Sequence, residues 1–314
     1  MYHFIINKNA SSGQAMKTWE DLREILNENS ILYREHFPSS VKECVSCIHE
    51  LEETAQSVHL VVIGGDGSLN VVLQGIRDFK NTTLSCIPVG SGNDFARALH
   101  ISTKPRLALR HLLKKPEEIK MDYGVVTYTN LAGKTHARRF IISAGVGYDA
   151  EVCEEVDRSR AKKFFNHLGL GQVVYGFIGL KKIFSGCRKS LCNQCDVRIQ
   201  FEDSEPRIMK DMFLCVSMNT PYQGGGAPFC PSADWKDGAL DFCTVDNMSA
   251  FKLLFAVLAV YIKQHLRFRE VRNDRSKSMT MHLSKPRWLH VDGDPQCEAN
   301  YVRTESKSGL RFIY

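Results

Sequence analysis

The chain has 314 residues, of which 43% are hydrophobic and 24% are charged. This is the composition of a soluble globular protein, and the length allows two domains with sizeable cores. A formal net charge of +6 favours weak attraction to nucleotides or anionic membrane surfaces, but no block of like charge marks a nucleic-acid-binding arm. We therefore expect no nucleic-acid partner.

The N-terminus and the cysteines favour a cytoplasmic protein. The apolar segment 2–6 is too short for a signal peptide, because a polar residue follows it at once. Eleven cysteines, an odd number, fit reduced thiols better than a disulfide framework. Two Cys-x-x-Cys pairs, Cys44 with Cys47 and Cys192 with Cys195, leave a split zinc site open, although core or incidental cysteines are favoured.

The N-terminal part of the chain alternates strands with helices. The expected strands are 2–6, 30–37 and 60–63, and the expected helices are 15–26 and 41–55. The run at 60–63 is short, unbroken and β-branched, as in a strand that is buried on both faces of a parallel sheet.

A glycine-rich turn follows this third strand. Gly64, Gly65 and Gly67 let backbone N–H groups approach a ligand, and Ser68 stands where the N-cap of a helix at 69–76 is expected. A strand, a glycine loop and a helix N-terminus together form an anion-binding site.

Asp66 lies inside this turn. A carboxylate there would repel a phosphate unless it bound a metal, accepted a proton or oriented another group, so its presence favours phosphoryl chemistry over passive phosphate binding. A tight Gly-Asp-Gly turn is the alternative, and these residues alone do not decide between the two.

A second copy of the pattern follows. The strand 84–87 ends at Pro88, and the segment 90–94, Gly-Ser-Gly-Asn-Asp, leads into a helix at 95–99. Successive βα units in one parallel sheet place both glycine loops on the same rim. Asn93 and Asp94 also suit helix caps.

The two glycine motifs carry a resemblance to a known family. GGDGSLN at 64–70 and PVGSGNDFAR at 88–97 resemble the diacylglycerol kinase catalytic-domain superfamily, in particular the bacterial soluble lipid kinases related to sphingosine and ceramide kinases. NAD kinases share GGDG, but the second motif resembles the lipid kinases alone. The resemblance covers nearly the whole chain.

The resemblance implies a nucleotide site at the ends of the first strands. The loop 7–13 matches the family's nucleotide loop, with Lys8 in place of the usual proline. The implied nucleotide-binding residues are Asn7, Asn9, Gly13, Gly64, Gly65, Asp66, Gly67, Ser68, Asn70, Gly90, Ser91, Asn93 and Asp94.

The character of the sequence changes near residue 120. After a helix at 105–113, a hairpin is expected from 121–128 and 137–143, and strand-like runs then outnumber helices. The later expected strands are 196–201, 212–218, 240–245, 279–283 and 289–291. We predict an α/β plus all-β protein: an N-terminal three-layer α/β domain with a parallel sheet at 1–120, and a C-terminal antiparallel β-sandwich domain at 121–301. The resemblance adds that the segment 302–314 returns to the first domain.

Two apolar segments bear on membranes. The segment 249–264 is too short to span a bilayer, and we favour a helix packed on the sandwich over an interfacial membrane helix. The segment 158–187 is both basic and apolar, which makes it the better candidate for touching lipid, although a helix with a buried stripe explains most of it.

The second domain carries further acids. The resemblance implies a Mg²⁺ site made by the Asp237 carboxylate with carbonyls near Asp234 and Ala239, and hard oxygen ligands suit this ion. Where the family has a glutamate assigned as the proton acceptor, this chain has Asp294. Asp292 and Asp66 are the alternative bases, and turns explain each motif without the family.

These observations predict an ATP- and Mg²⁺-dependent lipid kinase, with diacylglycerol as the default acceptor and phosphatidylglycerol, ceramide-like and polyprenol acceptors open. It would be cytoplasmic and transiently peripheral to the inner face of the membrane, where its lipid substrate lies, and a homodimer is open. The alternatives are a kinase of a soluble metabolite such as NAD and a non-catalytic lipid-binding or regulatory protein on the same fold.

Overall fold

The computed structural model describes residues 1–8, 14–159, 178–179, 195–202, 204–246 and 248–314. The chain divides into two units, of which unit 1 is Met1–Met121 with Ser308–Tyr314, and unit 2 is Asp122–Lys307. The returning segment begins at Ser308 rather than at 302. The reason is that the last strand, β14 (Asp294–Ile313), still pairs with its unit 2 neighbour β13 (Ser278–Val291) as far as Glu305.

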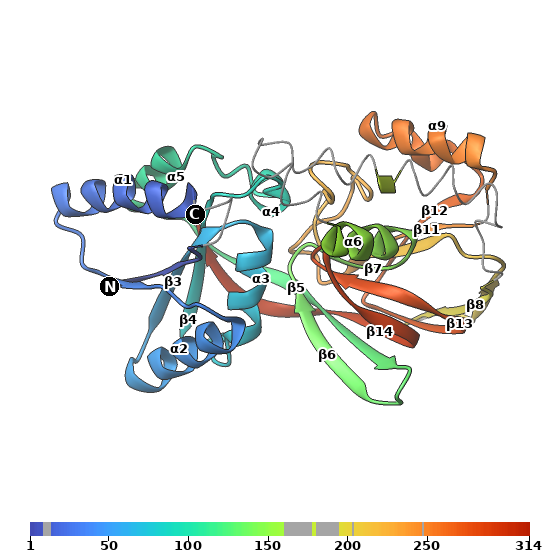
Figure 1. Cartoon of the computed structure of the whole chain (residues 1–314), viewed down its shortest axis with the longest axis horizontal. Coiled ribbons are helices and arrows are strands. Elements are labelled where there is room, and N and C mark those ends of the chain that lie inside the picture. Colours follow the sequence, from blue (N-terminus) through green and yellow to red (C-terminus); the bar gives the residue numbers. More distant parts are fainter. Residues whose placement is uncertain (9–13, 160–177, 180–194, 203, 247) are drawn as a thin grey trace. The chain divides into compact units, whose positions relative to one another are not determined.

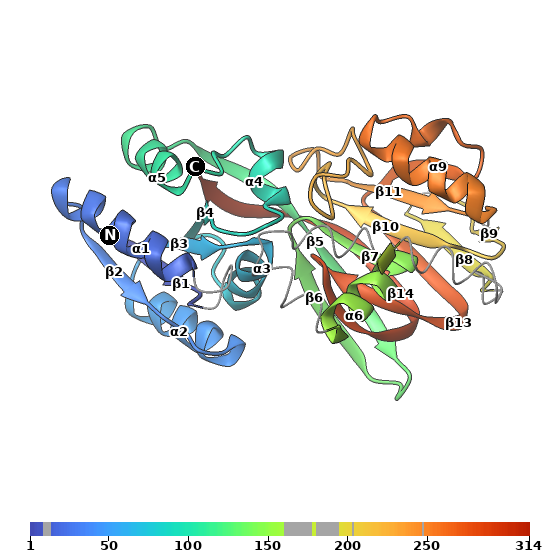
Figure 2. The same cartoon turned by 45° about the horizontal axis from the view of Figure 1, so that its top comes forward.

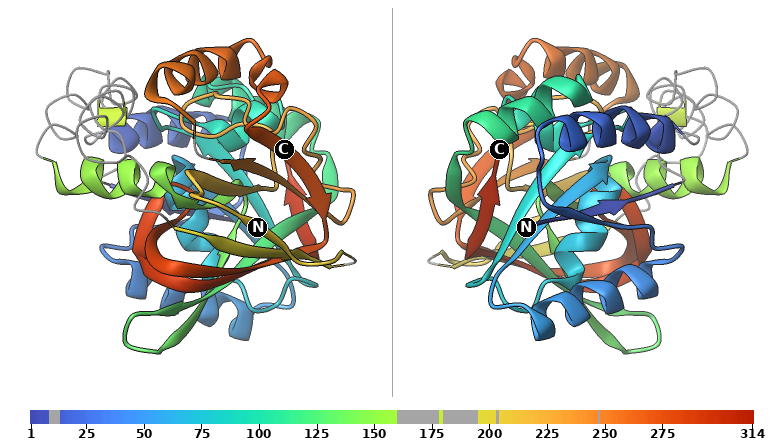
Figure 3. Two further views of the ribbon diagram at one scale, coloured as in Figure 1. Left: turned by 90° about the vertical axis from the view of Figure 1, so that its right-hand side faces the viewer. Right: turned by 90° about the vertical axis from the view of Figure 1, so that its left-hand side faces the viewer.

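Unit 1 is a parallel sheet covered on both faces by helices (Figure 1). The strand order is β2-β1-β3-β4, followed by the end of β14, which pairs with β4 in parallel. Helices α1 and α5 cover one face, and α2 and α3 cover the other (Figure 3). The predicted three-layer α/β domain is thereby confirmed. Its elements are β1 (Tyr2–Ile6), α1 (Gln14–Glu28), β2 (Tyr33–His36), α2 (Val41–Thr54), β3 (Val58–Gly64), α3 (Asp66–Gly75), β4 (Thr82–Pro88), α4 (Asp94–Ala98) and α5 (Pro105–Lys114).

Alternating side chains of the unit 1 sheet fill its two cores. Phe4 of β1 and Val61 of β3 belong to the core under α1 and α5, together with the buried Trp19. On the other face α2 and α3 pack closely, since a Cβ atom on Gly75 would lie 2.7 Å from Cδ1 of Ile48. Such packing fixes where the carboxyl ends of the strands lie relative to the helices that follow them.

Unit 2 is built from antiparallel strands, which confirms the predicted β-sandwich. The strand order is β12-β11-β10-β7-β13-β14, with the pairs β5–β6 and β8–β9 attached to β14 and β13. The two strands expected at 279–283 and 289–291 form one strand, β13, with a register shift between His282 and Arg287. The elements are β5 (Glu118–Asn130), β6 (Thr135–Phe140), β7 (Ser143–Gly147), α6 (Tyr148–Arg158), β8 (Val197–Phe201), β9 (Arg207–Met209), β10 (Leu214–Met218), β11 (Leu240–Val245), α9 (Ala250–Tyr261), the 3-10 turn η2 (His265–Arg267), β12 (Val271–Ser276), β13 (Ser278–Val291) and β14 (Asp294–Ile313).

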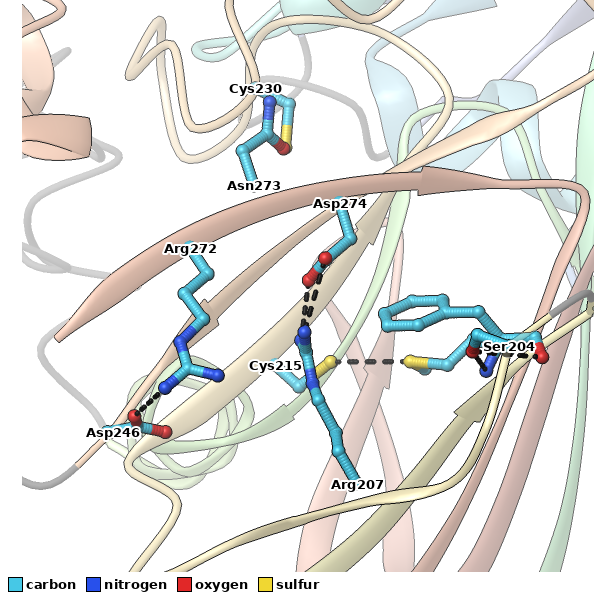
Figure 4. A network of polar contacts seen from close by, with 10 residues as sticks. Ser204, Arg207, Cys215, Cys230, Asp246, Arg272, Asn273 and Asp274 are labelled. Atoms are coloured by element: carbon cyan, nitrogen blue, oxygen red, sulfur yellow. Dashed lines mark hydrogen bonds and ion pairs between the residues drawn. The ribbon is translucent and has the colours of Figure 1, made fainter. Parts of the chain in front are cut away.

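Charged residues line β12, the polar edge strand that hydrophobic patterning does not reveal. Figure 4 shows Asp274 of β12 paired with Arg207 of β9, whose Nη1 lies 3.2 Å from Oδ1. The same view shows Arg272 paired with Asp246 at 3.4 Å. Because charged side chains line an edge strand, the edge is protected from pairing with another sheet.

The membrane-related expectations have different outcomes. The segment 249–264 does contain a helix, α9, that packs on unit 2 as expected. Most of the segment 158–187 lies outside the described residues. Within the described part of the chain, no helix is both long and apolar enough to cross a bilayer.

Candidate active site

The first glycine loop connects β3 directly to α3. The helix begins at Asp66 with Gly65 as its N-cap, so it starts earlier than predicted. Ser68 is therefore not the cap but lies in the first turn, where its Oγ accepts a hydrogen bond of 2.9 Å from Nδ2 of Asn7. This contact ties the end of β1 to the loop after β3, as expected for neighbouring strands that end on one rim.

Gly65 and Gly90 bring the two glycine loops into backbone contact. A Cβ atom on Gly65 would lie 3.2 Å from the Cα of Gly90, and a Cβ on Gly90 would lie 2.8 Å from the Cα of Gly65. The Val89 N–H also donates to the carbonyl of Gly64 at 2.9 Å. Gly90 needs glycine because the partner here is backbone, which cannot move aside as a side chain could, and the approach at Gly65 is tight.

Asp66 joins these loops through its carboxylate. Oδ2 accepts a hydrogen bond of 3.0 Å from the N–H of Asp94, and Oδ1 accepts one of 3.3 Å from the N–H of Phe95. Of the three roles that the sequence left open for this acid, the structure supports orienting another group. Charge-assisted bonds of this kind hold the start of α4 against the start of α3.

Asn93 and Asp94 shape the second loop. Asn93 adopts a left-handed backbone (φ 51°), and its side chain bonds back to Gly90, accepting from N–H at 3.0 Å and donating to O at 2.8 Å. It precedes α4 but does not cap the helix with its side chain. Asp94 is buried, and its Oδ1 lies 3.0 Å from Nη1 of Arg97.

The remaining predicted nucleotide residues differ in exposure. Gly67 and Ser91 are exposed at the loops, while Asn70 is buried in α3 and accepts a hydrogen bond from Gln74. Asn9 and Gly13 lie outside the described residues. Unit 1 thus gathers the described members of the predicted set at the carboxyl ends of β1, β3 and β4.

The acids of the Asp-Gly-Asp turn between β13 and β14 have opposite environments. Asp292 accepts three backbone hydrogen bonds of 2.9 to 3.0 Å, from the N–H groups of Ile141, Ile142 and Ser143. The Asp294 side chain is 63% exposed, with the Arg138 guanidinium 3.9 Å from Oδ2. Asp292 therefore holds the turn in place, whereas the carboxylate of Asp294 is open to solvent.

A buried histidine lies beneath the same turn and was missed in the sequence. The Nδ1 atom of His290 accepts from the N–H of Gly293 at 3.2 Å, and Nε2 lies 2.7 Å from Oδ2 of Asp149. Glycine is required at Gly145, on the neighbouring strand, because a Cβ there would lie 2.4 Å from Nε2 of His290. The available signal was the segment 145–149, Gly-Val-Gly-Tyr-Asp, a third passage from strand through glycine to helix.

An arginine that the sequence did not single out lies among the acids of the predicted metal loop. Arg275 Nη1 lies 3.1 Å from Oδ2 of Asp237, and Nη2 lies 3.1 Å from Oδ2 of Asp241. Burial alone would lower the pKa of Arg275, but Asp241, Asp237 and Asp234 together raise it, so the guanidinium stays charged.

Backbone groups use the other acceptors of this loop. Asp237 Oδ1 accepts from the N–H of Ala239 at 3.0 Å, and Asp234 Oδ1 accepts from the N–H of Lys236 at 3.3 Å. Asp122 is buried, and its Oδ2 accepts a hydrogen bond of 2.7 Å from the N–H of Gly238. Where the resemblance implies a Mg²⁺ ligand at Asp237, the structure places the Arg275 guanidinium against this carboxylate and against that of Asp241.

Comparison with known proteins gives matches to two families. The family described as the diacylglycerol kinase catalytic domain matches residues 1–126, and the family described as the YegS C-terminal NAD kinase beta sandwich-like domain matches residues 142–307. The boundary between the two matches falls in the β5–β6 hairpin, which begins unit 2.

Individual relatives resemble most or nearly all of the chain. The protein described as "Putative lipid kinase YtlR" of Bacillus subtilis is 25% identical over 315 residues, covering 99% of this chain and 98% of the relative. A diacylglycerol kinase of Mycobacterium tuberculosis is 29% identical over 239 residues, covering 76% of this chain and 71% of the relative. The crystal structure described as a putative diacylglycerol kinase of Bacillus anthracis covers 100% of this chain and 94% of its own, with a TM-score of 0.76 and 19% identity, a likeness of fold.

Proposed function

Because the chain belongs to the diacylglycerol kinase catalytic-domain family, we propose that it transfers the γ-phosphoryl group of MgATP to a lipid hydroxyl, with diacylglycerol as the acceptor. The observation that carries this proposal is the pair of glycine loops held together by Asp66. Their backbone N–H groups, with the N-terminus of α3, suit the phosphates of a nucleotide.

The reaction assigns a different task to each group of residues. The acceptor oxygen forms a bond to the γ-phosphorus as the bond from that phosphorus to the bridging oxygen breaks, and ADP leaves. Asp294 accepts the hydroxyl proton as the new bond forms. The loops at Gly65 and Gly90 hold the phosphates in line, so that catalysis rests on positioning and charge. Bound with ATP, Mg²⁺ neutralises part of the phosphate charge.

Labelled ATP tests this proposal. We expect phosphate from γ-labelled ATP to appear in phosphatidic acid when diacylglycerol is presented in mixed micelles, with a requirement for Mg²⁺. Parallel reactions contain ceramide, phosphatidylglycerol, a polyprenol or NAD as acceptor. Labelled NADP would instead establish a kinase of a soluble metabolite, and the absence of transfer to every acceptor would support a non-catalytic lipid-binding protein.

A further inference from the structure

Helix α9 (Ala250–Tyr261) has two apolar faces, and the residues that the structure describes cover only one of them. Its inner face places Leu253 and Ala256 in a buried cluster with Val216 and Met218 of β10. Figures 1 and 2 show the helix beside β11 and β12 on the outside of unit 2. The packing expected from the sequence therefore explains half of the helix.

The outer face of α9 is exposed although it is strongly apolar. The exposed fractions are 72% for Phe251, 48% for Phe255, 59% for Leu258 and 68% for Ile262. These residues recur at intervals of three and four, so they lie along one face of the helix. A contiguous apolar patch of this kind on a globular protein marks an interaction site.

The residues that follow the helix are basic. Lys263, Arg267 and Arg269 are all exposed, as is the apolar Leu266 between them. The acid of this segment, Glu270, is paired with Lys252 at 2.7 Å. The exposed face is thus apolar with a positively charged border, which is the pattern of a helix that lies in the interface of an anionic membrane.

Charge distinguishes between a second copy of this chain and an anionic bilayer as the occupant of this face. A second copy docked through the same face would bring the basic borders of both copies together, which is unfavourable. An anionic bilayer offers both an apolar layer for Phe255 and Leu258 and negative head groups for Arg267 and Arg269.

We propose that the outer face of α9, with Leu266 and the basic residues after it, docks the protein on an anionic lipid surface. The aromatic and aliphatic side chains enter the head-group boundary, while the helix lies parallel to the membrane plane. This inference rests on the proposed function for its biological setting, because a kinase of membrane lipids must reach its acceptor at a bilayer.

Vesicle sedimentation tests the docking surface with the full chain. We expect binding to vesicles of phosphatidylcholine with phosphatidylglycerol, and much weaker binding to phosphatidylcholine alone. The double variant Phe255→Ser/Leu258→Ser should reduce the partition coefficient by about tenfold or more, because both side chains leave the apolar layer. Leu131→Ser/Ile208→Ser is the matched control, since these apolar residues are 63% and 71% exposed elsewhere in unit 2, and it should bind like the wild type.

The charged border is tested separately. Arg267→Glu/Arg269→Glu should remove the preference for phosphatidylglycerol, and raised salt should weaken binding of the wild-type protein. Equal vesicle binding by the wild type and the α9 double variant would overturn the proposal. A wild-type dimer in sedimentation that the same variant converts to monomer would also overturn it, in favour of a second copy as the occupant.

A water-soluble acceptor separates this inference from the proposed function. With a short-chain diacylglycerol below its micelle concentration, the α9 double variant should keep the wild-type rate, although it loses activity on vesicles. Loss of both activities would place α9 in folding or catalysis and overturn the docking role. Absence of transfer by the wild type would instead contradict the kinase proposal, and vesicle binding would still be decided by sedimentation.

Discussion

Asp292 and Asp294 lie two positions apart, yet their surroundings give them different tasks. The carboxylate of Asp292 is committed to three backbone N–H groups, whereas that of Asp294 faces solvent beside Gln296. Exposure suits a group that must approach a substrate, and a full set of hydrogen bonds suits one that must not move.

Matched substitutions should separate these two tasks. Asp292→Asn should lower the free energy of unfolding by about 2 to 4 kcal/mol, because an amide presents a donor to at least one of the three N–H groups. Asp294→Asn should leave the melting temperature nearly unchanged while lowering kcat by about tenfold or more and removing the acidic limb of the pH–rate profile. Denaturant unfolding and steady-state kinetics measure both. If the Asp294→Asn variant kept the wild-type kcat and the acidic limb, Asp294 would be a turn residue and not the base.

Arg275 gives a second contrast at this scale. Arg275→Gln should lower the free energy of unfolding by about 1 to 2 kcal/mol, discounted for the 46% exposure of its side chain, since Asp241 loses its cationic partner. Mg²⁺ should not raise the wild-type melting temperature but should partly restore that of the variant, because binding to the native state stabilises it. Arg272→Gln, in the exposed pair on the same strand, is the control and should change little. A wild-type melting temperature that rises by several degrees with Mg²⁺ would instead support a resident Mg²⁺ at this site.

The contact between the loops after β3 and β4 belongs to the scale of secondary-structure elements. Neither loop is shaped by its own sequence alone, since Gly65 and Gly90 are each limited by the backbone of the other loop. The carboxylate of Asp66 then fixes the start of α4 relative to α3. A substitution that strains one of these loops would therefore displace the other loop as well.

Alanine substitutions at Gly90 and Gly67 should differ in their effect on stability. Gly90→Ala should destabilise unit 1 by about 1 to 3 kcal/mol, because the new Cβ would lie 2.8 Å from the Cα of Gly65 and 2.7 Å from Oδ1 of Asn93. A Cβ on Gly67 meets no atom within 4 Å, and the residue is in the first turn of α3, so Gly67→Ala should be neutral or stabilising by up to about 1 kcal/mol. Thermal unfolding measures both, and equal stability of the two variants would contradict the close approach.

Four buried or half-buried histidines contribute to the response of the molecule to acid. Burial lowers the pKa of His3 and of His59 to about 4, and it lowers the pKa values of His36 and His265 as well. His59 is held neutral further by the amino terminus, and its Nε2 lies 2.8 Å from Oγ of Ser85. In the unfolded chain these side chains titrate near pH 6.5.

Stability should therefore fall as the pH decreases from about 6.5 to about 4. In this window the unfolded chain binds more protons than the native state, so the free energy of unfolding rises with pH. His59→Gln keeps a side-chain donor for Ser85 but does not titrate, and it should reduce the loss between pH 6.5 and 4.5 by about 1 kcal/mol. Urea unfolding at several pH values measures how the free energy of unfolding depends on pH. Identical slopes for the wild type and the His59→Gln variant would exclude His59 as a source of this pH dependence.

The local sequence determined the elements and the nature of the loops. Apolar runs such as 60–63 and the glycines that follow them specify strand, turn and helix within a few residues, because backbone freedom and hydrophobic periodicity are local properties. The two-domain fold followed from the same patterns, with the alternation of strands and helices giving way to a series of strands near residue 120.

The tertiary structure alone decided which partners each acid has. The donors that bind Asp292 begin at Ile141, far away in the sequence, and the donors that bind Asp66 lie at the start of α4. Arg275, the cation among the metal-loop acids, comes from β12, a strand without an apolar pattern. The sequence of α9 is apolar on both faces, and only the tertiary structure distinguishes the exposed face from the buried one. The type of a residue specifies which hydrogen bonds and ion pairs its side chain can form. Packing between distant segments of the chain decides which groups become its partners.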